Sequence, residues 1–364
     1  MVQLDSPRSG TQAQNQVFLD VEDILEKLEM PDGIIASPTP VVAKRVKVET
    51  AVDGTINVRF NSNKDDAFII DNEEGYSALA DMVGIPQSVV KKFGAKLTAP
   101  MVAHGIKDKE GLVVIRDADN RLLDVKDQYK MQPIIKPEQA IERMLLQWPE
   151  LKFQDGQVGK GDYQADILAI THDDERKLED LLAPGLHEFL PSGGDPFRAG
   201  VHVGFNSMGM TAPVIEPYLL RLVCRNGALH AEYLHDEWGR GYGEGDELWQ
   251  WFRDGLQASD MAVNNIMEKY AALVGDVIPE NERANAVAGY IRNARLNGED
   301  AQAVQAQAIN EPPRNQYDLF NIATNTATHS RRNKTLAQMM TQQRKATANV
   351  GGHIHGAYCP TCKK

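Results

Sequence analysis

The stretch AGVHVGFNS, residues 199–207, predicts the structure at the centre of this chain, because apolar residues alternate in it with glycine or polar residues. In an extended strand, successive side chains point to opposite faces. One face of such a strand carries Val201, Val203 and Phe205, and the other carries His202 and Asn206. We therefore predict a half-buried β-strand here.

The apolar segment PYLLRLVCRNGAL, residues 217–229, follows closely and carries two arginines. Proline is favoured at the first position of a helix, and Asn-Gly pairs are typical of a left-handed helix end. The pattern predicts a helix from Pro217 to about Asn226, with Leu220 and Cys224 facing inward. Arg221 and Arg225 would then lie one turn apart on the same stripe.

Outward from this centre, the sequence predicts hairpins mixed with helices. Residues 43–61 and 111–125 alternate around polar turns, and in the first hairpin a three-residue loop would pair Val48 with Phe60. Helical patterns cover the residues 21–28, 76–84, 86–94, 137–148, 263–275, 284–296 and 315–329. Since strands and helices do not alternate regularly, we predict an α+β fold.

Charge is distributed unevenly along the 364 residues. The formal net charge is −12, but all 51 acidic residues lie at or before Asp318, and the stretch 319–364 carries seven Lys or Arg. Such segregation indicates a basic arm that binds a polyanion or docks on its own acidic body. We expect an unstructured segment 1–16, a main α+β domain over 17–330 and a basic tail over 331–364.

Composition narrows the class of protein further. An apolar fraction of 42% is that of a globular protein, and no run approaches the length of a membrane helix. The N-terminal residues lack the apolar core of a signal peptide, and three cysteines are too few for a disulfide framework. We therefore expect a cytoplasmic protein with no membrane partner.

Four segments together resemble a known family. HVGFNSMGMTAPVIEPYLLRLVCRNGAL (202–229) and NQYDLFNIATNTATH (315–329) are similar to the phage/plasmid-like protein family, a domain of unknown function found in phages, prophages and plasmids. GIPQSVVKKFG (84–94) and LVVIRDADNRLLDVKDQY (112–129) match its N-terminal half in the same order. The resemblance covers residues 17–330, and the chain departs from the family pattern at Lys126 and Met208.

The resemblance implies a mobile-element origin and no settled activity. It also implies a weaker likeness in organisation to single-strand annealing proteins, which assemble as rings or filaments. Enzyme signatures do not support catalysis: Gly159-Lys160 lacks the spacing of a phosphate-binding loop, and neither a zinc-protease histidine pair nor a Gly-x-Ser-x-Gly elbow occurs. A hydrolase would require His202, Asn206 and carboxylates to converge in one cleft.

The C-terminal sequence HIHGAYCPTCKK predicts a metal site. His353, His355, Cys359 and Cys362 offer four zinc ligands within ten residues, with Cys-x-x-Cys around a Pro-Thr turn. We expect structural zinc, since four protein ligands leave no open position. The alternative is a free dithiol. A second cluster, His230, His235, Asp236 and Glu237, lacks such spacing and is better explained as a solvated acidic loop.

The predicted nucleic-acid contacts are basic and aromatic. On the body they are Arg221, Arg225, Arg240 and Tyr242, and on the tail Arg331, Arg332, Lys334, Arg344 and Lys345. Guanidinium groups suit phosphate oxygens and a tyrosine can stack on a base. The alternatives are arginines paired with body carboxylates and a tail that only solubilises or swaps between subunits.

Two functions remain in view. The first is sequence-independent binding or annealing of single-stranded nucleic acid by a phage- or plasmid-encoded homo-oligomer. The second is a structural or interaction protein that self-assembles through its basic, zinc-bearing tail. Only the first predicts a steep dependence of nucleic-acid affinity on salt.

Overall fold

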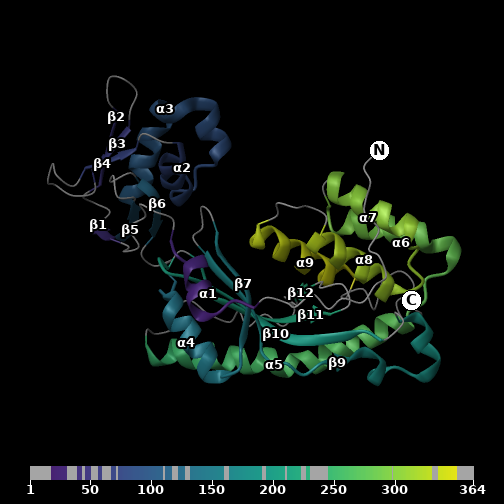
Figure 1. The fold of residues 1–364 in the computed structure, drawn as a ribbon. Helices are drawn as coiled ribbons and strands as arrows, with labels where there is room; N and C mark the ends of the chain where they lie inside the picture. The colour runs from purple at the N-terminus through teal and green to yellow at the C-terminus, as the bar shows by residue number, and fades with distance from the viewer. Residues whose placement is uncertain are drawn as a thin grey trace.

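The computed structural model has an α+β fold in two lobes, each with its own hydrophobic core (Figure 1). The N-terminal lobe and most of the main lobe lie within the range 17–330 that the sequence predicts as one domain, but the helix at residues 336–350, in the predicted tail, also packs on the main lobe. The structure describes the residues 18–30, 39–42, 46–50, 56–59, 67–70, 73–109, 111–116, 122–127, 132–159, 164–190, 194–209, 211–222, 227–229, 245–296, 298–329 and 335–350.

The N-terminal lobe combines two small antiparallel sheets with two helices. One sheet has the order β1-β5-β6, formed by Thr39–Val42, Gly111–Arg116 and Leu122–Asp127. The other has the order β2-β3-β4, formed by Lys47–Thr50, Ile56–Arg59 and Ala67–Ile70. Helices α2 (Glu73–Met82) and α3 (Gln87–Lys107) pack on them through a core that includes Leu79 and Val102.

The register of the first hairpin differs from the prediction by two residues. Val48 pairs with Val58 rather than Phe60. A shift of two residues keeps every side chain on its predicted face, because side chains alternate with a period of two. The hydrophobic pattern therefore predicts the faces correctly, while the turn that sets the register lies outside the described residues.

The main lobe is built on an antiparallel sheet with the order β12-β11-β10-β8-β7, and β9 adds to one end of β10. Its strands are β7 (Lys152–Val158), β8 (Gln164–Ile170), β9 (Arg176–Lys177), β10 (Pro196–Asn206), β11 (Val214–Arg221) and β12 (Gly227–Leu229). The predicted strand at residues 199–207 is confirmed as the centre of this sheet, β10.

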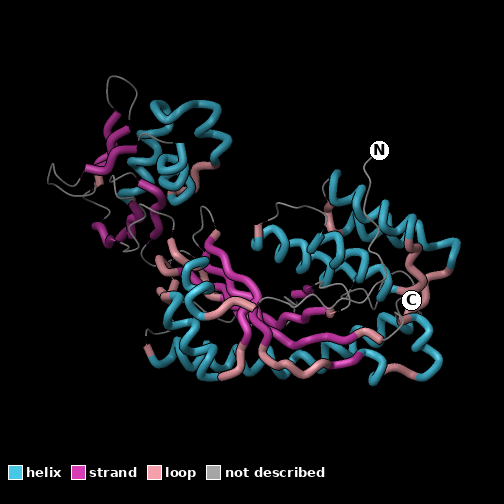
Figure 2. The backbone as a smooth tube through the Cα atoms, viewed as in Figure 1, coloured by secondary structure: helices cyan, strands magenta, loops and turns pink. Residues whose placement is uncertain are grey.

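Helices cover both faces of the sheet (Figures 1 and 2). One face packs against α1 (Val21–Lys27), α4 (Pro137–Gln147) and the long α5 (Asp246–Gly275). The other packs against α9 (Leu336–Val350), with α6 (Arg283–Asn293), α7 (Gly298–Asn310) and α8 (Gln316–His329) nearby. The prediction of a half-buried β10 is therefore wrong, since His202 and Asn206 are as buried as the valines on the opposite face.

The predicted helix at 217–226 is wrong where the structure describes it: Val214–Arg221 is strand β11. This strand lies between β10 and β12, and both of its faces are buried. A strand buried on two sides has no polar alternation, so a short apolar run cannot be told from a buried helix by its period. Pro217 lies outside the three residues that β12 pairs, Tyr218–Leu220.

Most other helices confirm the sequence pattern. Asp20 caps α1, because its carboxylate accepts a hydrogen bond from the Asp23 backbone N–H at 2.8 Å. The structure adds α7 and α9, which were not predicted. Short 3₁₀ helices occupy Leu178–Leu181, Pro184–Phe189 and Glu280–Glu282.

Candidate functional site

Arg221, the first predicted nucleic-acid contact, lies at the end of β11. It is buried and forms an ion pair inside the protein. Its Nε donates to both carboxylate oxygens of Asp195, at 2.6 and 2.8 Å. The hydroxyl of Tyr317 donates to the same carboxylate at 2.6 Å, and the guanidinium lies over the Tyr317 ring. For Arg221 the structure therefore supports the alternative, an arginine paired with a body carboxylate.

Arg344, predicted as part of a nucleic-acid-binding tail, also pairs internally. It lies on α9, which packs on the sheet through Leu336 and Met340. Its Nε donates to Oε1 of buried Glu216 at 2.8 Å. This part of the tail thus docks on the acidic body of its own chain. Lys345 lies on the same helix and is half-buried.

The other predicted contacts lie outside the described residues. They are Arg225, Arg240, Tyr242, Arg331, Arg332 and Lys334. The four predicted zinc ligands, His353, His355, Cys359 and Cys362, also lie outside, so structural zinc stays a prediction. Among the residues that the structure does describe, no group of three or more His, Cys, Asp or Glu is arranged to hold a metal ion.

A buried charged network lies between the sheet and α9, and sequence reasoning identified only part of it. His202 has its Nδ1 2.9 Å from Glu216 Oε1 and its Nε2 2.9 Å from Asp166 Oδ1. All three side chains are almost wholly buried. Ionised carboxylates only accept hydrogen bonds, so the contacts of His202 with Asp166 and Glu216 favour the imidazolium form, in which both ring nitrogens donate.

The pKa values of this network follow from its geometry. Burial alone would lower the pKa of His202, but the hydrogen bonds and charges of Asp166 and Glu216 outweigh burial and raise it. Burial would raise the pKa of Glu216, but His202 and Arg344 lower it to about 2. Two cations and two carboxylates therefore balance one another inside the fold, as buried charges require.

This network is a poor candidate for catalysis. His202 and carboxylates do converge, as a hydrolase would require, but His202 and Glu216 are completely buried under α9. The open groove between α1 and α4 is lined by other residues. Without access for a substrate, the network is best explained as the contact that holds α9 on the sheet.

The strongest exposed feature of the described residues is α3 in the N-terminal lobe. Its buried side is formed by Thr98, Ala99, Val102 and Ile106. Its exposed side carries three large apolar residues, Phe93, Leu97 and Met101, which are 50%, 67% and 55% exposed. Single exposed apolar residues are ordinary on a protein surface, whereas grouped ones indicate a binding surface, and Leu97 and Met101 are grouped because they lie four positions apart in the helical segment after Gly94.

The same helix is strongly basic. From Gly84 to Lys107 the chain has four lysines and a histidine but no Asp or Glu. Lys91, Lys92, Lys96 and Lys107 are all exposed, and no ion pair joins them to another described residue. We call the exposed side of α3, formed by Phe93, Leu97, Met101 and these lysines, the α3 face.

Gly94 shapes the α3 face by interrupting the helix. Its φ of 72° and ψ of 161° are not helical, and residues with a Cβ rarely adopt this conformation. Phe93 therefore ends the first helical segment, where its ring is half exposed and the Lys92 ammonium lies 5.4 Å from the ring centre. The break places an aromatic ring beside lysine charges on open surface.

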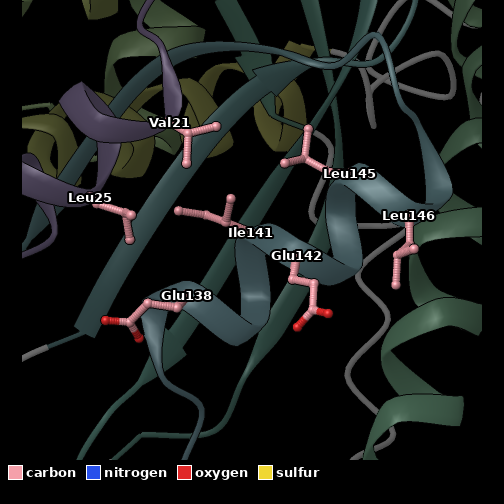
Figure 3. A pocket seen from close by; sticks show the side chains of 7 residues that line it. All are labelled: Val21, Leu25, Glu138, Ile141, Glu142, Leu145 and Leu146. Carbon is pink, nitrogen blue, oxygen red and sulfur yellow. The ribbon is translucent and has the colours of Figure 1, made fainter.

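A shallow groove of about 370 Å³ lies between α1 and α4 of the main lobe. Figure 3 shows Val21 and Leu25 of α1 facing Ile141 and Leu145 of α4. Leu146, Glu138 and Glu142 complete its lining, so the groove is apolar with two carboxylates and no basic residue. We call this feature the α1–α4 groove.

No described helix has both the length and the apolar composition needed to cross a bilayer. No family model, curated protein or solved structure matches the chain.

A signal for the α3 face was present in the sequence. The segment 84–107 combines lysines, exposed apolar residues and a complete absence of carboxylates. The nucleic-acid contacts predicted from the sequence did not include these lysines. The exposure of Phe93 and Leu97 could not be read from the pattern, because apolar residues at helical spacing are usually core residues.

Proposed function

We propose that this protein binds single-stranded nucleic acid without sequence preference, and that the α3 face is its contact surface. The observation that carries this proposal is the exposed aromatic ring of Phe93 close in sequence to the exposed lysines Lys91, Lys92 and Lys96, which form no ion pair with any residue that the structure describes. Lysines attract phosphates irrespective of sequence, and an exposed ring can stack on any base that is not already paired in a duplex.

The proposal moves the contact away from the arginines that the sequence favoured. Arg221 and Arg344 each pair with a buried or nearly buried carboxylate, so neither guanidinium is available to a phosphate without breaking an ion pair. The lysines of the α3 face have no such pair among the described residues. The net charge of −12 also requires that a polyanion be met by a local basic surface rather than by the whole molecule.

The resemblance to phage and plasmid proteins agrees with a role in the DNA metabolism of a mobile element. We propose the cytoplasm of the host cell as the compartment, because three cysteines are too few for a disulfide framework. No described group suggests a reaction, so the proposal is one of binding and not of catalysis.

The first prediction tests the α3 face by fluorescence anisotropy with a labelled oligothymidine and a duplex of equal length at several salt concentrations. Replacing Lys91, Lys92 and Lys96 by alanine should lower the slope of log affinity against log salt by about 2, since each phosphate contact to a single strand contributes roughly 0.7. Phe93→Ala should weaken single-strand binding by about 1–3 kcal/mol and leave duplex binding unchanged.

The matched control is Lys136→Ala, which removes an exposed lysine at the start of α4, outside the α3 face. Unchanged affinity in the triple lysine variant would contradict the proposal. A basic helix with exposed apolar residues also fits an anionic membrane surface. Binding to vesicles of phosphatidylglycerol, with no binding to oligothymidine, would replace nucleic acid by lipid as the partner.

A further inference from the structure

We infer that the α1–α4 groove is a docking site for the α3 face of a second copy of this chain. The groove and the face lie in different lobes and have opposite character. One is a concave apolar surface with carboxylates, and the other is a convex apolar helix with lysines. The inference goes beyond the proposed function and does not depend on it.

The shape of the two surfaces matches a known mode of recognition. An amphipathic helix binds an apolar groove through residues spaced three or four positions apart. Leu97 and Met101 are four positions apart on the helical segment after Gly94, and both are more than half exposed. The groove offers Val21, Leu25 and Leu145 as its apolar lining.

The charges of the two surfaces are complementary. Glu138 and Glu142 line the groove on α4, and Glu22 and Glu26 are exposed on the adjacent α1. The α3 face carries Lys92 and Lys96 beside its apolar residues. Complementary charges steer association and reject a partner of the same sign, so an acidic groove favours this helix over the acidic helices of the same chain.

The geometry of such a contact is head-to-tail. The surface used on one copy differs from the surface used on the next, so each copy keeps one free groove or one free α3 face. Heterologous contacts of this kind produce rings or open filaments rather than closed two-fold dimers. Since the α3 face is also the proposed nucleic-acid surface, a single strand would compete with the neighbouring copy for it.

The test uses sedimentation velocity on the full chain after nuclease treatment, over a concentration series of about 1 to 200 µM. The mean mass should rise above the 40.3 kDa monomer with concentration and fall as salt is added. Leu97→Asp on the α3 face and Leu146→Asp in the groove should each weaken self-association at least tenfold. Both residues are 67% exposed, so neither change removes core packing.

The decisive measurement is a mixture of these two variants. Leu97→Asp keeps an intact groove and Leu146→Asp keeps an intact α3 face, so together they should form a one-to-one complex that does not grow further. Met261→Asp is the matched control, because Met261 is 77% exposed on α5 and belongs to neither surface. A monomer at every concentration, or weakening by only one of the two variants, would overturn the inference.

A charge exchange provides independent support. Glu138→Lys with Glu142→Lys should prevent self-association, and so should Lys92→Glu with Lys96→Glu. All four changes in one chain should restore it. The proposed function is tested separately, because Leu146→Asp should bind oligothymidine normally. If that variant and the unaltered chain both fail to bind oligothymidine, the proposed function fails while the docking inference stands.

Discussion

At the scale of single residues, two charged side chains among the predicted contacts pair with carboxylates that are distant in the chain. Arg221 pairs with Asp195, and Arg344 reaches Glu216 across 128 positions. The sequence shows that these arginines lie among apolar residues, which predicts that they are not ordinary surface charges. It does not show which carboxylate each one meets.

The second prediction concerns the pH dependence of stability. The pKa of His202 is raised by folding, so its contribution is complete below the ordinary value of about 6.5 and is lost as pH rises through the folded pKa. The free energy of unfolding should therefore fall above pH 6.5 by up to about 1.4 kcal/mol per pH unit. The charged groups that face His202 are Asp166, Glu216 and Arg344. Nη2 of Arg344 lies 3.3 Å from Nδ1 of His202, and its positive charge opposes protonation of the His202 ring.

Urea unfolding between pH 5 and 9 measures this dependence. His202→Gln should cost about 3–5 kcal/mol near pH 6, because Asp166 loses the charge of His202 and Glu216 keeps only Arg344, and should abolish the loss on the alkaline side. His172→Gln, at a partly exposed histidine near Asp260, is the matched control. Below pH 4.5 the stability that depends on Glu216 declines as pH falls toward about 2. An alkaline profile identical in both variants would be inconsistent with a charged His202.

At the scale of secondary-structure elements, burial on both sides explains the main error of the sequence analysis. The helical pattern at 217–226 arose because β11 is covered on both faces and carries apolar residues throughout. By contrast, helices α1, α4 and α8 have polar residues on one side, so the spacing of their apolar residues was sufficient to predict them as helices. Helix α9 was missed because its buried side mixes apolar residues with polar ones, and the polar Gln343 and Thr347 lie inside the fold.

The third prediction concerns α9. Arg344→Met should leave the buried Glu216 with one cation instead of two and weaken the docking of α9 on the sheet. Removing one partner of a buried ion pair costs about 3–5 kcal/mol. Hydrogen exchange of the amides in residues 336–350 should therefore accelerate at least 100-fold, while exchange in β10 changes less.

Lys345→Met removes the same charge from the neighbouring position of α9 and serves as the control. The cations that lower the pKa of Glu216 are His202 and Arg344, and both remain in this control. Equal acceleration in both variants would mean that the loss of positive charge on α9 matters, and not the ion pair with Glu216.

At the scale of the whole molecule, the two lobes have separate hydrophobic cores. Leu79 belongs to the core of the N-terminal lobe, and Ile266 on α5 belongs to that of the main lobe. Separate cores allow separate unfolding, because cooperativity requires shared packing. The two surfaces proposed for binding, the α3 face and the α1–α4 groove, lie one on each lobe.

The fourth prediction is that calorimetry resolves two transitions. Leu79→Ala should destabilise the N-terminal lobe by about 2–5 kcal/mol and lower only its transition, by about 10 °C or more. Ile266→Ala should lower only the transition of the main lobe. One transition that shifts as a whole in both variants would show that the lobes unfold together.

The sequence by itself determined the α+β class, the central strand, most helices and the faces of the first hairpin, because these depend on local periodicity and on capping residues such as Asp20. It also contained the basic composition of α3. The predicted contacts and zinc ligands in residues 225–242 and 331–364, apart from Arg344 and Lys345, lie outside the described residues and stay predictions.

Only the tertiary structure decided which charges are satisfied and which are exposed. The pairing of Arg221 with Asp195 and of Arg344 with Glu216 depends on strands and helices that meet far from one another in sequence. The exposure of Phe93 and Leu97 depends on which side of α3 packs against the N-terminal lobe. Periodicity shows that a helix has two sides, but the packing of the whole chain decides which of them meets solvent.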